Sequence, residues 1–163
     1  MTIKVGDTIP SMKIMMATPD GPKETSTDEI FKGKTVVLFG VPGAFTPTCS
    51  VRHLPGFVQH AEKFAAKGVD TIACVAVNDV FVMSAWAKDQ GVDGKIVMLG
   101  DGSGALIKAL GLELDLTARG MGVRSQRFAL VAVDGKVTHL NVEQPGGFEV
   151  SKAEAILGQL SSA

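Results

Sequence analysis

FGVPGAFTPTCSVRHLPGF, the stretch Phe39–Phe57, contains the change of pattern from which the fold can be read. The residues that lead into it, Thr35–Phe39, form a short run rich in β-branched side chains, which predicts a buried strand. Prolines and glycines then force a loop, because they cannot continue a strand. Beyond the loop, apolar residues recur at helical spacing, which predicts an amphipathic helix from Cys49 to about Ala66. Cys49 is therefore expected in the first turn of a helix.

This placement gives Cys49 a reactive environment. Free backbone N–H groups and the positive end of the helix dipole meet the first turn, and both favour a thiolate over a thiol. Thr46 precedes the cysteine by one helical turn and can direct its hydroxyl toward the sulfur. The alternative is a small buried hydrophobe, but a packing cysteine has no need of a loop rich in proline and glycine. We therefore interpret Cys49 as a nucleophile.

The motif around Cys49 resembles that of a known family. Pro42-x-x-x-Thr46-x-x-Cys49 is the pattern that peroxiredoxins carry around their peroxide-reducing cysteine. The longer run Val41–Ser50, followed by His53–Phe57, resembles the type II, or peroxiredoxin-five-like, subgroup. The resemblance runs from about Val5 to Leu160, with further matches at Val77-Asn78-Asp79, Phe81-Val82-Met83, Ala85-Trp86-Ala87, Asp101-Gly102-Ser103-Gly104 and Arg124-Ser125-x-Arg127-Phe128-Ala129-Leu130.

This resemblance implies an activity and a site. The activity is a thiol-dependent peroxidase that reduces hydrogen peroxide and alkyl hydroperoxides through a Cys49 sulfenic acid. Its reductant would be a glutaredoxin and glutathione or a thioredoxin system, and the protein would be a homodimer. We expect neither a cofactor nor a metal. The implied catalytic residues are Pro42, Thr46, Cys49 and Arg127, and the implied peroxide-binding residues are Gly43, Phe45, Thr46, Cys49 and Arg127.

Arg127 is the candidate cation of the site. Peroxide reduction needs donors for the charge that grows on the leaving oxygen, and a cation would also stabilise the thiolate. Arg127 matches the arginine that the family carries at the head of an Arg-Phe strand. A charge at the start of an apolar strand is unusual as packing alone. Arg124 is the alternative for this role.

Cys74 is the second cysteine and lies in a predicted buried strand, Thr71–Val77. Composition alone leaves it as readily a core residue as a redox-active one. Resemblance to plant and bacterial type II members implies that it is the resolving thiol. A disulfide needs Cα atoms within about 7 Å, and a folded α/β core would hold Cys49 and Cys74 farther apart. We therefore expect two free thiols, and local unwinding before they join, which Pro55 would make easier.

The order of elements along the chain predicts the fold class. Strands and helices alternate over the first two thirds, and a hairpin and a helix finish the chain. Hairpin turns are predicted at Asp20-Gly21 and Asp134-Gly135, and helix caps at Ser26 and Ser151. We predict an α/β chain with a central mixed sheet flanked by helices and an N-terminal hairpin extension. It forms one domain over residues 1–163, and the resemblance implies a thioredoxin-like fold.

Leu112–Met121 is predicted to be a long connection with apolar side chains. Exposed apolar side chains on a loop often mark a partner surface. This stretch, together with the loop before Cys49, therefore favours a homodimer.

Composition excludes several classes of protein. The net charge of −1 and the pI of about 6.3 give no reason to expect nucleic acid or an anionic membrane as partner. No apolar run approaches the roughly 20 residues that span a bilayer. The N-terminus lacks an apolar signal segment, and two cysteines do not make a disulfide framework. We expect a cytoplasmic protein, although an organellar form without its targeting peptide would look the same.

Other chemistries are weaker readings of the same residues. His53 follows Cys49 by one helical turn, which invites a Cys/His hydrolase, but no Asn or Asp is placed to orient the imidazole. A metal site of Cys49, His53 and Cys74 lacks paired-ligand spacing. Gly102-x-Gly104 lacks the context of a dinucleotide fingerprint. A redox sensor or chaperone-like binding protein on the same fold remains the alternative to an enzyme.

Overall fold

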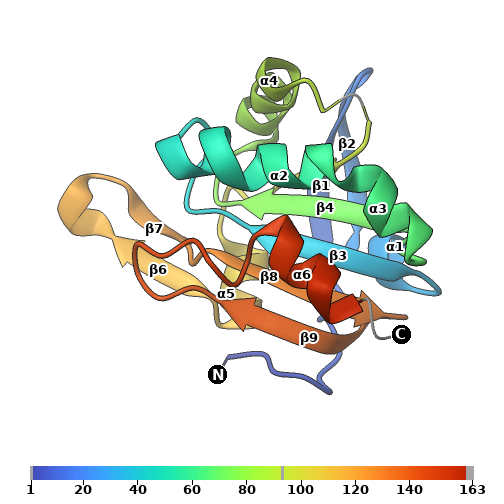
Figure 1. The fold of residues 1–163 in the computed structure, drawn as a ribbon. Coiled ribbons are helices and arrows are strands. Elements are labelled where there is room, and N and C mark those ends of the chain that lie inside the picture. Colours follow the sequence, from blue (N-terminus) through green and yellow to red (C-terminus); the bar gives the residue numbers. More distant parts are fainter. Residues whose placement is uncertain (1, 93, 161–163) are drawn as a thin grey trace.

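The molecule is built on one mixed sheet of seven strands (Figure 1). The computed structural model describes residues 2–92 and 94–160, so the ends of the predicted domain lie outside the described residues. The strand order is β2-β1-β5-β4-β3-β8-β9, and β3, β4 and β5 run parallel while the other pairs are antiparallel. The strands are β1 (Lys13–Thr18), β2 (Gly21–Ser26), β3 (Thr35–Gly40), β4 (Thr71–Ala76), β5 (Val97–Gly100), β8 (Phe128–Val133) and β9 (Lys136–Val142).

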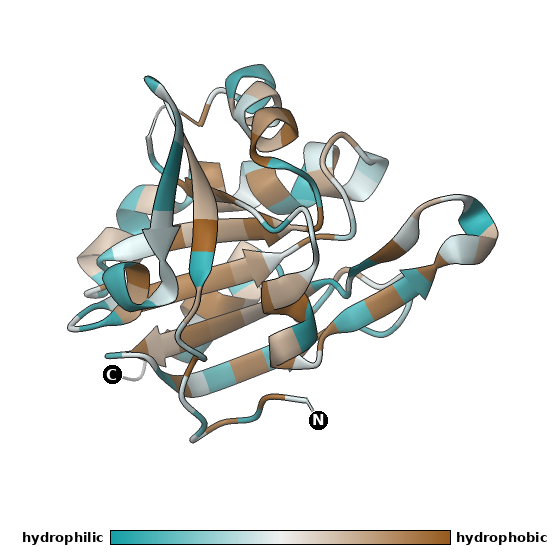
Figure 2. Ribbon diagram, turned by 180° about the vertical axis from the view of Figure 1, so that it is seen from behind, coloured by the Kyte–Doolittle hydropathy of each residue, from teal (hydrophilic) through white to brown (hydrophobic). Residues whose placement is uncertain are grey.

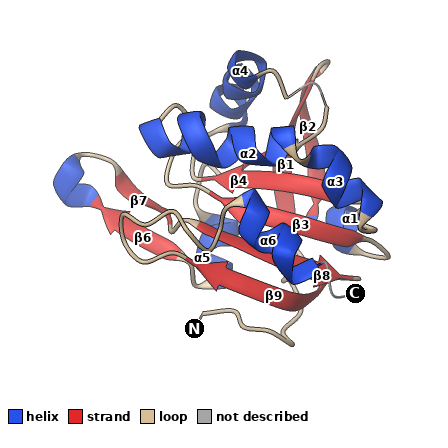
Figure 3. Ribbon diagram, viewed as in Figure 1, coloured by secondary structure: helices blue, strands red, loops and turns tan. Residues whose placement is uncertain are grey.

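Helices cover both faces of this sheet, and the apolar central strands lie between them (Figures 2 and 3). Along β3, Val37 and Phe39 pack under α2, α3, α4 and α6, whereas Val36 and Leu38 pack on the opposite face with α1 and α5. This arrangement and the hairpin β1–β2 confirm the predicted α/β class. The helices are α1 (Thr27–Phe31), α2 (Leu54–Gln59), α3 (Ala61–Ala66), α4 (Val80–Gln90), α5 (Ala105–Leu110) and α6 (Ala153–Leu160).

The two predicted helix caps have different outcomes. The Ser26 side chain accepts a hydrogen bond from the backbone N–H of Glu29 at 3.1 Å and caps α1 as predicted. Ser151 does not cap α6 in this way, because its hydroxyl donates to the carboxylate of Glu143 at 2.7 Å. A serine two residues before a helix therefore has another role here.

The predicted loop Leu112–Met121 is instead largely a hairpin, which is a correction. It forms β6 (Glu113–Leu116) and a 3-10 turn, η2 (Thr117–Arg119), and it leads into β7 (Gly122–Ser125), which pairs with β6. The hairpin β6–β7 projects from the main sheet (Figure 1). Leu112 is fully buried, whereas Leu114 and Leu116 are half-buried. These leucines alternate with polar residues, which is the period of a strand.

The predicted continuous helix from Cys49 to Ala66 is divided into three pieces. Cys49–His53 forms a π-helical turn, η1, in which the N–H of Leu54 donates to the carbonyl of Cys49. Because Pro55 has no N–H to give to an α-helical bond, the backbone before it widens. The chain then continues as α2 and, after a break at His60, as α3.

Candidate active site

Cys49 and Arg127 meet because the sheet brings the ends of two strands together. β3 and β8 pair antiparallel with Gly40 opposite Phe128, so the loop that leaves β3 lies beside the residue that precedes β8. Arg127 donates from Nη2 to the sulfur of Cys49 at 3.2 Å, and Cys49 has no exposed surface. The alternative cation, Arg124, instead donates from Nε to the carbonyl of Met121 at 2.9 Å. Arg127 thus places a cation within hydrogen-bonding distance of the buried sulfur.

Thr46 is held by the loop that contains it. Its hydroxyl donates to the carbonyl of Gly43 at 2.6 Å, rather than to the sulfur as the sequence had suggested. This bond leaves the oxygen lone pairs of Thr46 free to accept a hydrogen from another group. Gly43 is buried, and a Cβ there would lie 3.2 Å from Nη1 of Arg124 and 3.2 Å from Cγ2 of Thr46. The lack of a side chain at Gly43 therefore leaves room for Arg124 and Thr46 beside it.

His53 is a site residue whose role sequence reasoning missed. Its Nδ1 lies 3.0 Å from Nη1 of Arg127, and its Nε2 lies 3.0 Å from the carbonyl oxygen of Ser151. Because arginine can only donate and a carbonyl can only accept, Nδ1 is the acceptor and Nε2 carries the hydrogen. Burial, and then the charge of Arg127, lower the pKa of His53 to about 3, although the bond to Ser151 opposes this. The neutral imidazole thus accepts a hydrogen bond from Arg127 and does not act as a base for Cys49.

A cleft of about 530 Å³ opens beside these groups. Its lining comes from the loop before Cys49, the β6–β7 hairpin, the residues before β8 and the loop after β9. Phe45 does not line it: the residue is 51% exposed, and its ring lies 6.5 Å from that of Trp86. The lining residues are Pro42, Thr46, Pro47, Thr48, Leu114, Leu116, Arg119, Met121, Gln126, Arg127, Glu143, Gln144, Pro145, Gly146 and Gly147.

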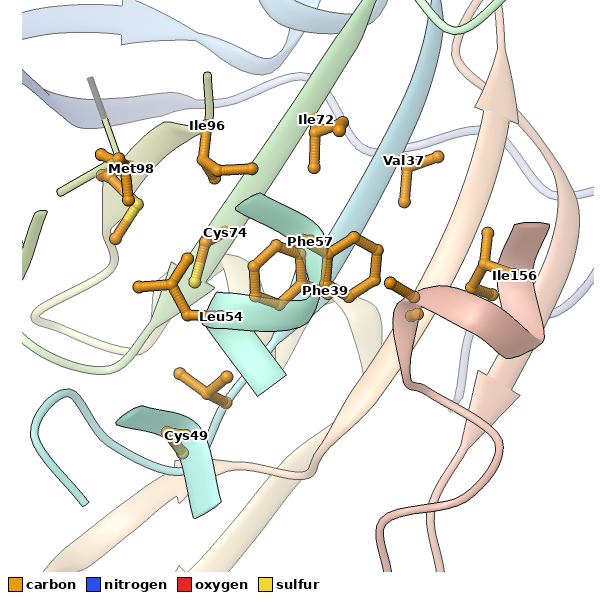
Figure 4. Close-up of a cluster of buried hydrophobic side chains, with 14 of the residues drawn as sticks. Val37, Phe39, Cys49, Leu54, Phe57, Ile72, Cys74, Ile96, Met98 and Ile156 are labelled. Atoms are coloured by element: carbon orange, nitrogen blue, oxygen red, sulfur yellow. The ribbon is translucent and has the colours of Figure 1, made fainter. Parts of the chain in front are cut away.

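Cys74 lies on β4, opposite Phe39 of the neighbouring β3, and it is fully buried. Both cysteines are free thiols, as predicted, and Figure 4 shows Leu54 between them in that view. Burial, and then the negative charge of Cys49, raise the pKa of the Cys74 thiol well above its usual value, while Arg127 opposes the shift. Cys74 is therefore a protonated thiol in the folded state.

Within residues 2–92 and 94–160, no group of three or more His, Cys, Asp or Glu side chains is arranged to hold a metal ion. No helix in the same ranges is both long enough and apolar enough to cross a membrane.

Comparisons with known proteins agree with this geometry. The Redoxin family model matches residues 4–157. Peroxiredoxin-2C of Oryza sativa subsp. japonica is 52% identical over 97% of this chain and 98% of its own length. The crystal structure of reduced Prx3 from Vibrio vulnificus in complex with H2O2 is 51% identical, with a TM-score of 0.93 over 98% of this chain and 100% of that one.

Related proteins include a chloroplastic Peroxiredoxin-2E-2 of Oryza sativa subsp. japonica and a mitochondrial Peroxiredoxin-2F of Arabidopsis thaliana. The family match and full-length similarity to peroxiredoxins accord with a buried cysteine and an arginine beside it at the end of a mixed sheet. The chain therefore belongs to the Redoxin family and, within it, to the type II peroxiredoxins, thiol-dependent peroxidases of thioredoxin-like fold.

Proposed function

We propose that Cys49 is the residue that reduces hydrogen peroxide and alkyl hydroperoxides. The single observation that carries this assignment is the 3.2 Å contact from Nη2 of Arg127 to the buried sulfur. The thiolate attacks one peroxide oxygen, the O–O bond breaks, and Cys49 becomes a sulfenic acid. The leaving oxygen takes the electron pair and then a proton, which gives water or an alcohol.

Arg127 and Thr46 act on this step in different ways. The guanidinium stabilises the thiolate before the attack and the charge on the leaving oxygen during it. The oxygen of Thr46 accepts the hydrogen of the incoming hydroperoxide, because its own hydrogen is engaged by Gly43. Backbone N–H groups near Gly43 contribute to binding the peroxide, and Pro42 forms part of the wall of the cleft. Phe45 is exposed and does not line the cleft, so we assign its ring to a dimer contact instead.

We infer that Cys74 resolves the sulfenic acid within the same chain. The thiol of Cys74 displaces water from the sulfenic acid and forms a disulfide, which a thioredoxin or a glutaredoxin and glutathione system then reduces. Both cysteines are buried in one cluster but are not bonded to each other, and we infer that η1 opens before the sulfurs meet. Its wide hydrogen-bonding pattern before Pro55 supports such opening, and the bond from Trp86 to Ser50 at 3.0 Å opposes it.

The assembly and location belong to the same proposal. Three large apolar side chains are strongly exposed on segments near the cysteine: Phe45 at 51%, Val51 at 72% and Phe81 at 69%. Such side chains suit a homodimer contact beside the site. The two core clusters share one sheet, which supports a single domain over residues 1–163. We propose a cytoplasmic location, with an organelle as the alternative, since relatives of this chain include chloroplastic and mitochondrial proteins.

The function is tested by peroxide consumption with a thiol reductant. Cys49→Ser should abolish turnover with thioredoxin and with glutaredoxin and glutathione. Cys74→Ser, assayed with glutaredoxin and glutathione, is the matched control, because it also removes one buried thiol while Cys49 stays in place, and a small thiol can reduce the Cys49 sulfenic acid without Cys74. Retained turnover in Cys49→Ser would refute the assignment. A wild-type protein that oxidises once and then stops would instead support the redox sensor.

A further inference from the structure

We propose that His53 and Glu143 are positioning residues that hold the guanidinium of Arg127 against the sulfur of Cys49. The proposal rests on the function given above and adds two residues to it. The hydrogen bonds of the two side chains go to Arg127, Ser151 and Glu149 rather than to the sulfur, so each would act through the arginine. The geometry that supports it is a closed series of hydrogen bonds, which begins and ends at Arg127.

The first hydrogen bonds of this closed series, which we call the circuit, fix the orientation of the guanidinium of Arg127. Nη2 of Arg127 donates to Cys49 at 3.2 Å, and Nη1 donates to Nδ1 of His53 at 3.0 Å. The guanidinium is planar, so two bonds from its two terminal nitrogens define its orientation. Without the second acceptor the group could rotate away from the sulfur and toward the cleft that Arg127 lines.

The second part of the circuit fixes the imidazole. Nε2 of His53 donates to the carbonyl of Ser151 at 3.0 Å. The imidazole is also enclosed by aromatic rings, with centroids 4.9 Å away at Phe39, 5.6 Å at Phe57 and 5.2 Å at Phe148. The ring therefore has one orientation, and Nδ1 faces Arg127.

The third part of the circuit fixes Ser151 and returns to the arginine. One oxygen of Glu143, Oε2, accepts from the N–H of Ser151, the hydroxyl of Ser151 and the N–H of Glu149, each at 2.7 Å. Glu143 is only 8% exposed, and its own N–H donates to the carbonyl of Arg127 at 2.9 Å. The carbonyl of Arg127 thus fixes Glu143, and Glu143 fixes Ser151. Ser151 in turn orients His53, which accepts the hydrogen bond from the side chain of Arg127.

The charges around Arg127 are consistent with this role. His53 remains neutral because burial, and then Arg127, depress its pKa, so it does not repel the guanidinium. Burial raises the pKa of Glu143, but the hydrogen bonds from Ser151, Glu149 and Val150 outweigh it and lower the pKa overall. A further cation, Arg52, lies over the ring of Phe148, with its guanidinium carbon 4.6 Å from the ring centroid. Among the described contacts of His53, Nδ1 accepts its hydrogen bond from Arg127.

The test is a double-mutant cycle on the oxidation of Cys49. His53→Phe keeps the ring contacts but removes the acceptor and the donor. We expect it to slow single-turnover oxidation by hydrogen peroxide about tenfold, as loss of a preorganised interaction does. In the Arg127→Gln background the same substitution should change the rate less than about twofold, because its effect passes through the arginine. His53→Gln, which retains an acceptor and a donor, should recover part of the rate.

Two further readouts separate positioning from folding. The pH midpoint for alkylation of Cys49 by iodoacetamide should rise in His53→Phe, and it should not rise further when Arg127→Gln is already present. Glu143→Gln is the second variant and should show the same dependence on Arg127 with a smaller loss, about threefold. If His53→Phe does not fold, as judged by circular dichroism, the cycle with Glu143→Gln decides the question.

Equal losses with and without Arg127 would overturn the proposal, and so would a wild-type oxidation rate in both His53→Phe and Glu143→Gln. Failure of the proposed function looks different. In that case Cys49 of the unmutated protein would not be oxidised by peroxide at all, and no cycle could be built.

Discussion

The two cysteines share a core cluster and are equally buried, yet their surroundings are opposite. Cys49 lies in a widened helical turn with the guanidinium of Arg127 at 3.2 Å. Cys74 lies inside a parallel strand, and burial raises the pKa of its thiol. Burial alone therefore does not determine thiol reactivity. What distinguishes the two is the guanidinium of Arg127, which is held beside Cys49.

The largest effect is expected from removing the cation. Arg127→Gln should slow oxidation of Cys49 by about tenfold or more, because the thiolate and the leaving oxygen both lose a charged donor. Thr46→Val should act in the same direction. Stopped-flow fluorescence of the single tryptophan, Trp86, can follow the reaction. Arg124→Gln is the matched control, and a loss in that variant with none in Arg127→Gln would mean that the wrong arginine has been assigned.

The second effect concerns the role of Cys74. Cys74→Ser should lose most turnover with thioredoxin, about tenfold, because no resolving thiol can form the disulfide. It should keep much of its turnover with glutathione and glutaredoxin, since a small thiol can attack the Cys49 sulfenic acid directly. Steady-state peroxide consumption with each reductant measures both. Full activity with every reductant would make Cys74 a packing residue.

The third effect is the dependence of stability on pH. The pKa of His53 is about 3 in the folded protein and 6.5 in an unfolded chain, so between these values only the unfolded chain binds the proton. Stability should therefore fall as pH drops below 6.5, by up to about 1.4 kcal/mol per pH unit. Urea unfolding of the wild type and of His53→Phe gives the contribution by difference. The contribution of Glu143 to protein stability is also lost in acid, because its pKa is lowered in the folded state, but this loss occurs in both proteins. Parallel pH profiles for the two would contradict this account of His53.

The smallest effect concerns the hold on the cysteine turn. Ser50 accepts a hydrogen bond from the indole of Trp86 at 3.0 Å, which ties η1 to α4. Ser50→Ala should lower the free energy of opening η1 by about 1 kcal/mol. Disulfide formation after oxidation should then be about fivefold faster. Quenched-flow alkylation with mass spectrometry measures the rate. Ser103→Ala, at an exposed serine, is the control, and equal rates in both variants would show that opening of the turn does not limit the step.

The features that sequence reasoning recovered are local. The strands β3, β4 and β8 carry continuous apolar runs, and the loop before Cys49 carries prolines and glycines, so both follow from short windows of sequence. The pairing of Cys49 with Arg127 came from family resemblance, and the antiparallel register of β3 and β8 supplies its physical cause.

The features that sequence reasoning missed depend on contacts between distant segments. The sequence pairs His53 with the two cysteines, as a base or a metal ligand, whereas its partners Arg127 and Ser151 lie far along the chain. A proline signals that a helix is disturbed, but it does not say that the preceding turn becomes π-helical. In β6 the leucines alternate with acidic residues, which is the period of a strand, so the sequence does carry a signal for this hairpin.

The measurement that tests the central claim most directly is trapping of the sulfenic acid. The protein is treated with stoichiometric hydrogen peroxide in the presence of dimedone, and the modified cysteine is identified by mass spectrometry. The account predicts an adduct on Cys49 in the wild type and in Cys74→Ser, and none in Cys49→Ser. An adduct on Cys74 in Cys49→Ser, formed as fast as that on Cys49 in the wild type, would contradict it.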